Sequence, residues 1–316
     1  MTTIFELGST LNGRYRLEAL LGAGGMGTVY RAFDTERGHE VALKFPVTEH
    51  DTKDRSAAIV REFATLKQFD HPGILKALDN GTTEDGKAFF SMEVVEGESL
   101  GAVITSCALP EITIRHGWLC EIARALLHIH EKGFLYCDLK PDNVIICKNS
   151  SAENSIKLLD FGITVPASEG LRASELEARG TTEYMSPEQH KGTKIDFRSD
   201  IYSFGVLAFE VLTGERPFKL DKAVDTEMAK VTKYLALHAK GKIPSPHALN
   251  PEVPKDLSTI VEVCMQKRRD DRFESMREVC ECLATADGSS LLTHVLRGIA
   301  TKFFGSSFAK GPNPQR

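Results

Sequence analysis

The sequence predicts an α+β fold in which strands and helices are segregated along the chain. Between residues 15 and 95, short β-prone runs alternate with glycine and aspartate turns, and one helical pattern interrupts them. From residue 96 to residue 286, apolar residues recur mainly with the spacing of helices. We therefore expect a leader at 1–14, two structured parts at 15–95 and 96–286, and a tail at 287–316.

A glycine-rich loop lies near the start of the first structured part. Leu21 leads into a G-x-G-x-x-G-x-V spacing made by Gly22, Gly24, Gly27 and Val29. Glycine has no Cβ, so backbone amides in such a loop can approach phosphate oxygens closely. The spacing alone is a weak signal, because a dinucleotide-binding βαβ unit shares it.

The residues that follow the loop decide between these two possibilities. In a dinucleotide-binding unit the glycines open a helix. Here a β-prone run follows at 28–33, a turn comes at 34–38, and a second strand follows at 41–44. The glycines are therefore predicted to join two antiparallel strands.

Lys44 ends the strand at 41–44, where an isolated ammonium group is costly to bury. It needs anionic partners, namely phosphates on one side and a carboxylate on the other. We favour Glu62, inside a helical pattern from about Asp54 to Phe69, over Glu49, which precedes that pattern. The alternative is that Glu62 belongs to an ordinary solvated pair with its neighbour.

The second structured part carries another set of polar residues. It reads Asp-Leu-Lys-Pro-Asp-Asn from Asp138 to Asn143, and Asp160 later opens an Asp-Phe-Gly triplet. Asp138 can accept a proton from an attacking hydroxyl, and Lys140 can offset negative charge on a phosphoryl group in transfer. Asn143 and Asp160 offer the hard oxygen ligands that Mg²⁺ prefers. The two strings together predict phosphoryl transfer assisted by magnesium.

These residues resemble a protein kinase catalytic domain, and in particular a bacterial eukaryotic-like (Hanks-type) serine/threonine kinase. The resemblance covers about residues 15–283 and includes further matches at Gly180–Glu188, Ser199–Gly205 and Arg272. It implies a two-lobed fold with an antiparallel-sheet small lobe, one main helix in that lobe, and a mainly helical large lobe. It also implies that Arg272 pairs with Glu188.

The same resemblance implies how ATP and Mg²⁺ bind. Lys44, with Glu62 behind it, would hold the phosphates, and Asn143 and Asp160 the metal. The residues implied around the adenine are Val29, Ala42 and Ile145 on its two faces, Met92 as gatekeeper, and Glu93 to Val95 as the hinge. Ordinary core packing is the alternative for the aliphatic residues that would lie on the two faces.

The chain departs from the family pattern just before Asp138. Tyr136 and Cys137 stand where the family usually has histidine and arginine. That arginine normally pairs with a phosphate on the activation segment, so its loss predicts an enzyme that does not need this phosphate. Cys137 could instead act as a redox switch, but we favour a small buried residue, because nearby carboxylates raise a thiol pKa.

The resemblance implies a serine/threonine protein kinase that acts on protein hydroxyls. A nucleotide-binding pseudokinase scaffold is the alternative, but none of Lys44, Asp138, Asn143 and Asp160 is lost. A small-molecule kinase is a weaker third possibility, because Gly180–Glu188 resembles a segment that builds a peptide-docking surface.

Composition sets further limits. The 316 residues, 41% of them hydrophobic, suffice for the cores of two lobes, and a net charge of −5 gives no basic surface for nucleic acid. Seven scattered cysteines indicate reduced thiols and a cytoplasmic protein. No run of apolar residues is long enough to predict a transmembrane segment.

The tail at 287–316 contains an apolar stripe at helical spacing, formed by Leu292, Val295, Leu296, Ile299 and Phe303. We expect an amphipathic helix that docks on a partner or on the kinase domain itself. Binding to a membrane surface ranks below docking, because only two basic residues, Arg297 and Lys302, lie beside the stripe.

Overall fold

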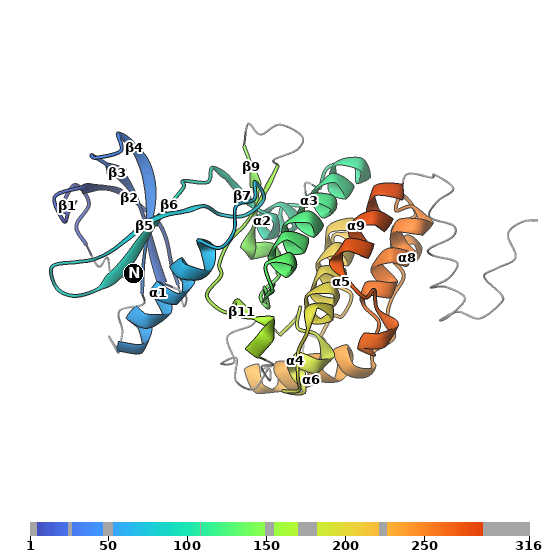
Figure 1. Cartoon of the computed structure of the whole chain (residues 1–316). Helices are drawn as coiled ribbons and strands as arrows, with labels where there is room; N and C mark the ends of the chain where they lie inside the picture. Colours follow the sequence, from blue (N-terminus) through green and yellow to red (C-terminus); the bar gives the residue numbers. More distant parts are fainter. Residues whose placement is uncertain are drawn as a thin grey trace, which may run out of the picture. The chain divides into compact units, whose positions relative to one another are not determined.

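The computed structural model describes residues 5–24, 27–46, 53–107, 109–148, 155–169, 182–220 and 226–286. Its contacts divide the chain into two compact units (Figure 1). The small unit comprises Met1–Ser99 and Asn143–Thr164, and the large unit comprises Leu100–Asp142 and Val165–Arg316. The tail at 287–316, with its expected helix, lies outside the described residues.

The small unit contains an antiparallel sheet with the strand order β1-β2-β3-β4-β6-β5. Its strands are β1 (Thr10–Leu11), β2 (Tyr15–Gly24), β3 (Gly27–Asp34), β4 (His39–Phe45), β5 (Ala77–Thr82) and β6 (Ala88–Met92). The turn between β3 and β4 forms because the Asp34 carboxylate accepts the amides of Glu36 and Arg37, while Gly38 takes a φ of 72°. Arg14 donates two hydrogen bonds to the same carboxylate.

Helix α1 (Lys53–Leu66) packs against β6, where the rings of Phe63 and Phe90 lie 6.0 Å apart. The sheet also carries a hydrophobic core cluster. Its buried residues come from β2, β3, β4 and β6, and include Tyr15, Tyr30 and Phe45. α1 ends at Leu66, whereas the sequence pattern extends to Phe69, because the chain turns there with the Phe69 amide bonded to the Leu66 carbonyl.

A second, smaller sheet completes the small unit. Its order is β10-β9-β7, with β7 at Gly97–Ser99, β9 at Val144–Cys147 and β10 at Ile156–Leu158. The amide of Leu158 bonds to the carbonyl of Gly73, and the Leu158 carbonyl accepts the amide of Leu75. Segments far apart in the sequence are thereby joined by backbone hydrogen bonds.

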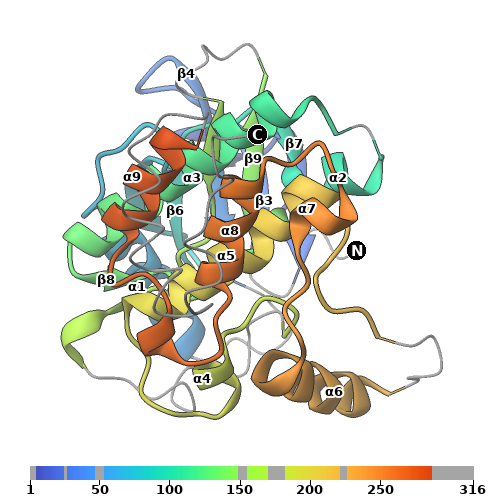
Figure 2. The same ribbon diagram turned by 90° about the vertical axis from the view of Figure 1, so that its right-hand side faces the viewer.

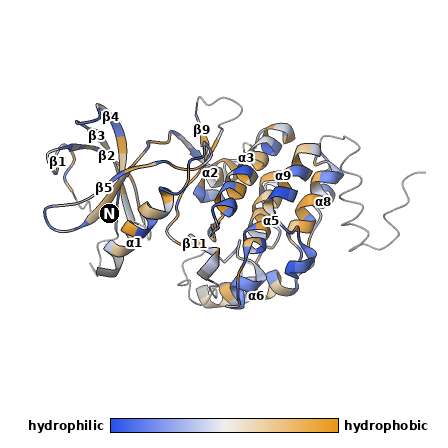
Figure 3. Cartoon of the chain, viewed as in Figure 1, coloured by the Kyte–Doolittle hydropathy of each residue, from blue (hydrophilic) through white to orange (hydrophobic). Residues whose placement is uncertain are grey.

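The large unit is built around α5 (Phe197–Thr213), whose residues from Ser199 to Leu212 are all buried. The Asp196 side chain caps its first turn, and Gly214 ends it in the left-handed conformation at φ 76°. α5 contacts α3 (Ile112–Glu131), α8 (Lys255–Cys264) and α9 (Met276–Thr285) (Figure 2). Apolar residues run along α5 (Figure 3), as burial on several sides requires.

The large unit contains further helices and strands around these four helices. They are α2 (Leu100–Thr105), β8 (Phe134–Leu135) paired with β11 (Val165–Pro166), η1 (Pro141–Asn143, which crosses the border between the units), η2 (Ala167–Glu169), α4 (Pro187–His190), α6 (Glu227–Lys240), α7 (Pro246–Leu249) and η3 (Arg269–Asp271). The residue pattern from Lys219 to Ala239 predicts one helix, but this prediction of its start is wrong. Lys219 and Leu220 are not helical, and Thr226 caps α6 by accepting the Ala229 amide. None of the helices in the described ranges is long and apolar enough to cross a membrane.

Candidate active site

In the small unit, one lysine lies between two carboxylates. Lys44 Nζ is 2.6 Å from Glu62 Oε1 and 3.6 Å from Asp160 Oδ1. β4 and α1 supply the first pair, and both side chains are more than nine-tenths buried. Burial lowers the pKa of Lys44, but the two carboxylates outweigh burial and raise the pKa above its ordinary value. The ammonium therefore stays charged in its buried position.

The Asp160 carboxylate is held by a sharp turn. Its backbone has a φ of 55°, a left-handed value that aspartate tolerates better than most residues. The Gly162 amide donates to Asp160 Oδ1 at 3.1 Å. The next residue, Phe161, is buried with its ring 5.4 Å from that of Phe69. This packing of Phe161 holds the backbone directly after Asp160 in place.

The glycine loop joins β2 to β3, so the predicted antiparallel arrangement is confirmed and a dinucleotide-binding βαβ unit is excluded. Gly24 pairs with Gly27 across the loop, and Gly27 has a φ of 133°. A side chain at Gly27 would collide with the carbonyl oxygen of Phe45, whereas Gly22 and Gly24 border open space. Leu21 is exposed at the edge of this loop.

The residues predicted around an adenine lie on β3, β4, β6 and β9 and in the segment after β6. Ala42 pairs with Met92 across β4 and β6, and both are buried. Val29 and Ile145 are half-buried, so part of each side chain remains available to a ligand. Neither residue is therefore completely buried in the core.

The segment after β6, which the sequence predicts as a hinge, is anchored through Glu93. Its side chain accepts the Lys76 amide at 2.8 Å and pairs with Lys157 Nζ at 2.6 Å. Its own amide donates to the Lys76 carbonyl. Val95, two residues on, is half-buried.

Asn143 and Asp160, the oxygen ligands predicted for a metal, lie at the two ends of the β9–β10 hairpin. Val144 pairs with Leu158, and the Leu159 amide donates to the Asn143 carbonyl at 2.8 Å, directly before Asp160. No group of three or more His, Cys, Asp or Glu residues forms a metal-binding cluster within the described ranges. Magnesium commonly uses one or two protein ligands together with substrate phosphates, so this donor set fits that ion.

In the large unit, Lys140 Nζ lies 2.8 Å from Asp138 Oδ2, and both residues are buried. Asp200 on α5 organises the chain just before them. Its carboxylate accepts the backbone amides of Tyr136 and Cys137 at 2.8 and 2.9 Å. Sequence reasoning missed this role of Asp200, although the motif that contains it was identified.

Cys137 is buried, and burial together with the Asp200 and Asp138 carboxylates raises the pKa of its thiol well above the ordinary value. The thiol is therefore protonated and a poor nucleophile, which favours a packing role over a redox switch. It carries no positive charge with which to bind a phosphate.

The segment that ends at α4 is tied to both α5 and the Asp138 loop. Arg272 Nη1 and Nη2 donate to the two oxygens of Glu188 at 2.6 and 2.9 Å, as the family resemblance implies. Ser199 Oγ donates to Glu188 Oε1, and Gln189 Nε2 donates to the Cys137 carbonyl at 3.3 Å. Burial raises the pKa of Glu188, but Arg272 and Ser199 outweigh it and lower the net value.

Comparison with known proteins agrees with this geometry. The family model for the protein kinase domain matches residues 15–283. The chain is 35% identical to the serine/threonine-protein kinase pkn2 of Myxococcus xanthus over 315 residues, covering 96% of this chain and 36% of that protein. It is 32% identical to PknA of Mycobacterium tuberculosis over 277 residues, covering 85% and 60%.

A solved structure of the M. tuberculosis PknI kinase domain has the same fold. The TM-score is 0.66 at 22% identity, covering 90% of this chain and all of that one. The chain therefore belongs to the protein kinase domain family, in its bacterial eukaryotic-like (Hanks-type) serine/threonine branch. The chain spans 36% of the length of pkn2 and 60% of the length of PknA.

Proposed function

We propose that this chain is a serine/threonine protein kinase that transfers the γ-phosphoryl group of ATP to hydroxyls of protein substrates. The observation that carries the proposal is the buried Lys44–Glu62 ion pair with Asp160 beside it. A kinase requires this pair for productive phosphate binding. A pseudokinase scaffold has no need to maintain it.

Each predicted site residue has a role in this proposal. Asp138 orients the acceptor hydroxyl and takes its proton, and Lys140 steadies the transferring group. Lys44 and the amides around Gly22, Gly24 and Gly27 bind the phosphates. The adenine is held by Leu21, Val29, Ala42 and Ile145 together with the Met92 to Val95 segment.

Asn143 and Asp160 would hold Mg²⁺, which when bound neutralises charge on the phosphates. Their side chains offer an amide oxygen and a carboxylate, and the carboxylate of Asp160 is partly exposed. Glu62 fixes the position of Lys44, and it does so without itself being available to a metal, because it is paired and buried.

We further propose that activity does not depend on phosphate in the activation segment. The support is Cys137, whose neutral buried thiol replaces the arginine that would bind such a phosphate. Protein treated with a phosphatase and then freed of it should retain its rate. Inactivity of the dephosphorylated protein, restored by rephosphorylation of the segment, would refute this proposal.

The transfer itself is tested with labelled ATP, magnesium and a generic protein substrate. The wild type should transfer label, and Asp138→Asn should lose about 10²- to 10⁴-fold in rate. Asp270→Asn, in which an exposed aspartate outside the site is changed, is the matched control and should keep its activity. Equal signals from wild type and Asp138→Asn would favour the pseudokinase alternative.

Three broader proposals rest on the sequence. We propose residues 15–286 as the catalytic domain, and the tail at 287–316 as a segment that docks on that domain or on a partner. Reduced thiols and a need for ATP favour the cytoplasm. Strong co-sedimentation of a tail peptide with liposomes would reverse the ranking of docking over membrane binding.

A further inference from the structure

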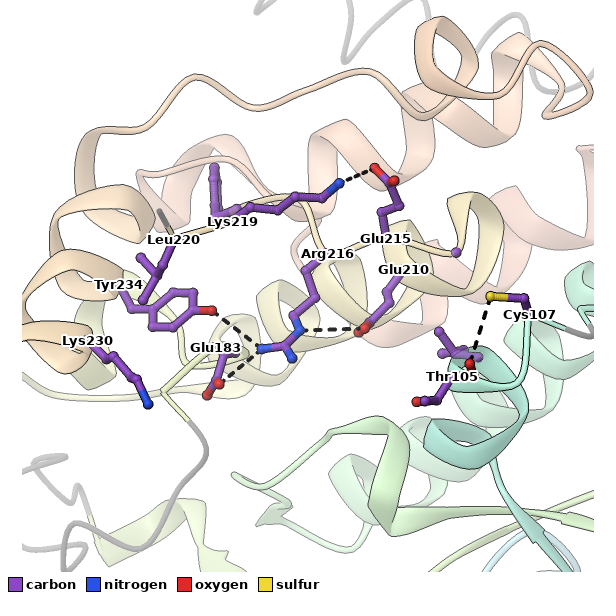
Figure 4. Close-up of a pocket in the computed structure, with 13 residues that line it drawn as sticks. Thr105, Cys107, Glu183, Glu210, Glu215, Arg216, Lys219, Leu220, Lys230 and Tyr234 are labelled. Atoms are coloured by element: carbon purple, nitrogen blue, oxygen red, sulfur yellow. Dashed lines mark hydrogen bonds and ion pairs between the residues drawn. The ribbon is translucent and has the colours of Figure 1, made fainter. Parts of the chain in front are cut away.

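A pocket of about 760 Å³ lies within the large unit and is not used by the chemistry described above (Figure 4). It is bordered by α2, by Glu183 ahead of α4, by the end of α5 with the residues that follow it, and by α6. Three glutamates and three basic residues line it: Glu183, Glu210, Glu215, Arg216, Lys219 and Lys230. The formal charges of its lining therefore cancel.

One arginine of this lining joins two of the glutamates. Arg216 Nη1 lies 3.0 Å from Glu183 Oε1, and Arg216 Nε lies 3.7 Å from Glu210 Oε1 (Figure 4). Arg216 Nη1 also donates to the Tyr234 hydroxyl of α6 at 3.4 Å. Two carboxylates from different segments thus converge on a single guanidinium group.

The burial of Glu210 explains why a cation is needed there. Its side chain is only 10% exposed, and burial raises the pKa of its carboxyl group. The Tyr184 hydroxyl donates to Glu210 Oε2 at 2.5 Å, while Oε1 faces Arg216. The Arg216 side chain is 41% exposed, so the cation that covers this buried carboxylate can be reached by solvent and by a peptide.

The pocket and the loop that carries Asp138 are linked by the chain segment just before α4 and by α4 itself. Glu183 and Tyr184 belong to the same segment as Gln189, which donates to the carbonyl of Cys137, the residue directly before Asp138. A peptide that followed this segment to Asp138 would place one side chain beside the acidic pair Glu183 and Glu210 and another with its hydroxyl at Asp138. Without Arg216, that pair would attract arginine or lysine.

We infer that Arg216 is a specificity-determining residue: its guanidinium group occupies the Glu183–Glu210 pair, so the pocket does not select a basic side chain of the substrate. The inference rests on the proposed kinase function. Because Arg216 is part of the same chain, its effective concentration at the pair exceeds that of a free peptide. Removal of Arg216 should therefore create a preference for basic residues.

Peptide libraries that vary one position at a time around the acceptor hydroxyl test this inference. Arg216→Ala should raise kcat/KM for arginine or lysine at one position by about tenfold over wild type, as a charge-assisted hydrogen bond would. The double variant Arg216→Ala with Glu183→Gln should lose most of that gain. The matched control is Arg198→Ala, because Arg198 pairs with Asp270 outside the pocket and the wild-type profile should persist.

Two further results separate specificity from folding and from catalysis. If Arg216→Ala does not fold, Arg216→Gln removes the charge but keeps hydrogen-bonding groups, and it should show the same gain. An unchanged profile in the folded variant, or a wild type that already selects basic residues at that position, overturns the inference alone. A wild type that phosphorylates no peptide, and no more than Asp138→Asn does, overturns the proposed function and this inference with it.

Discussion

Asp200 holds the backbone of Cys137 in the left-handed region. Its Oδ1 accepts the Cys137 amide at 2.9 Å, and Cys137 has a φ of 67°. A residue other than glycine is strained in that conformation by about 1–3 kcal/mol, so it persists only where the surrounding structure enforces it. The strained residue directly precedes Asp138, which links α5 to the geometry of the candidate active site.

Replacement of Asp200 should therefore destabilise the large unit. Asp200→Ala leaves the amides of Tyr136 and Cys137 without their buried acceptor, and also removes the partner of His130 Nε2 at 2.8 Å. We expect a loss of about 3 kcal/mol in the free energy of unfolding, measured by urea denaturation. Asp270→Ala removes an exposed carboxylate and should change the free energy of unfolding by at most about 0.5 kcal/mol. Equal effects of the two substitutions would contradict this account.

The buried pair of Glu188 and Arg272 should dominate over surface pairs. Arg272→Ala leaves the Glu188 carboxylate buried without its bidentate partner, and we expect a cost of about 3–5 kcal/mol in unfolding free energy. Arg277→Ala breaks an ion pair with Glu131 in which both side chains are about half-exposed, and should cost about 0–1 kcal/mol. Chemical denaturation measures the unfolding free energy of both variants. Equal losses in Arg272→Ala and Arg277→Ala would contradict the prediction.

Two glycines in helices should respond oppositely to alanine. A Cβ at Gly205 of α5 would lie 2.7 Å from Cys264 Cβ and 2.8 Å from Met265 Cγ, so Gly205→Ala should destabilise by about 1–3 kcal/mol. A Cβ at Gly117 of α3 meets no atom within 4 Å. Gly117→Ala should stabilise by about 0.5–1 kcal/mol, because alanine favours helix. Thermal unfolding measures both signs, and destabilisation by Gly117→Ala would be the contrary result.

Acid should weaken the large unit through His238. Burial, helped by interactions with His190 and Lys267, lowers the pKa of His238 from 6.5 to about 3. The unfolded chain then binds a proton that the folded chain refuses, so this contribution to stability is full above about pH 6.5 and is lost as the pH falls towards 3. By about pH 5 the loss should approach 2 kcal/mol.

His238→Asn should remove most of this pH dependence, because asparagine does not titrate. His39→Asn is the matched control, since His39 is exposed, and its pH profile should follow that of the wild type. The measurement is the free energy of unfolding between about pH 7 and pH 5. A wild-type slope that survives in His238→Asn would assign the acid sensitivity to other groups.

Much of the fold and of the candidate site could be predicted from local patterns. The antiparallel strands around the glycine loop follow from β-prone residues on both sides of it, and the choice of Glu62 over Glu49 follows from helical periodicity. Arg272 with Glu188 came from the family resemblance rather than from any spacing.

What could not be predicted depends on contacts between distant segments. Nothing in the periodicity of α5 shows that the Asp200 carboxylate points at the amides of Tyr136 and Cys137. The convergence of Glu183 and Glu210 on Arg216 likewise requires two segments to meet in space. The start of α6 was missed because helix-forming residues extend N-terminal to the Thr226 cap.

The path of the chain through the small unit has a consequence for biosynthesis. Residues 143–164 return to this unit after the chain has already formed part of the large one, and they bring β9, β10, Asn143 and Asp160 with them. A nascent chain that has emerged only as far as Ser99 thus lacks strands that the finished unit pairs internally. Its maturation on the ribosome must wait until α3 and residues 143–164 have been synthesised, so part of the large unit emerges before the small unit can be completed.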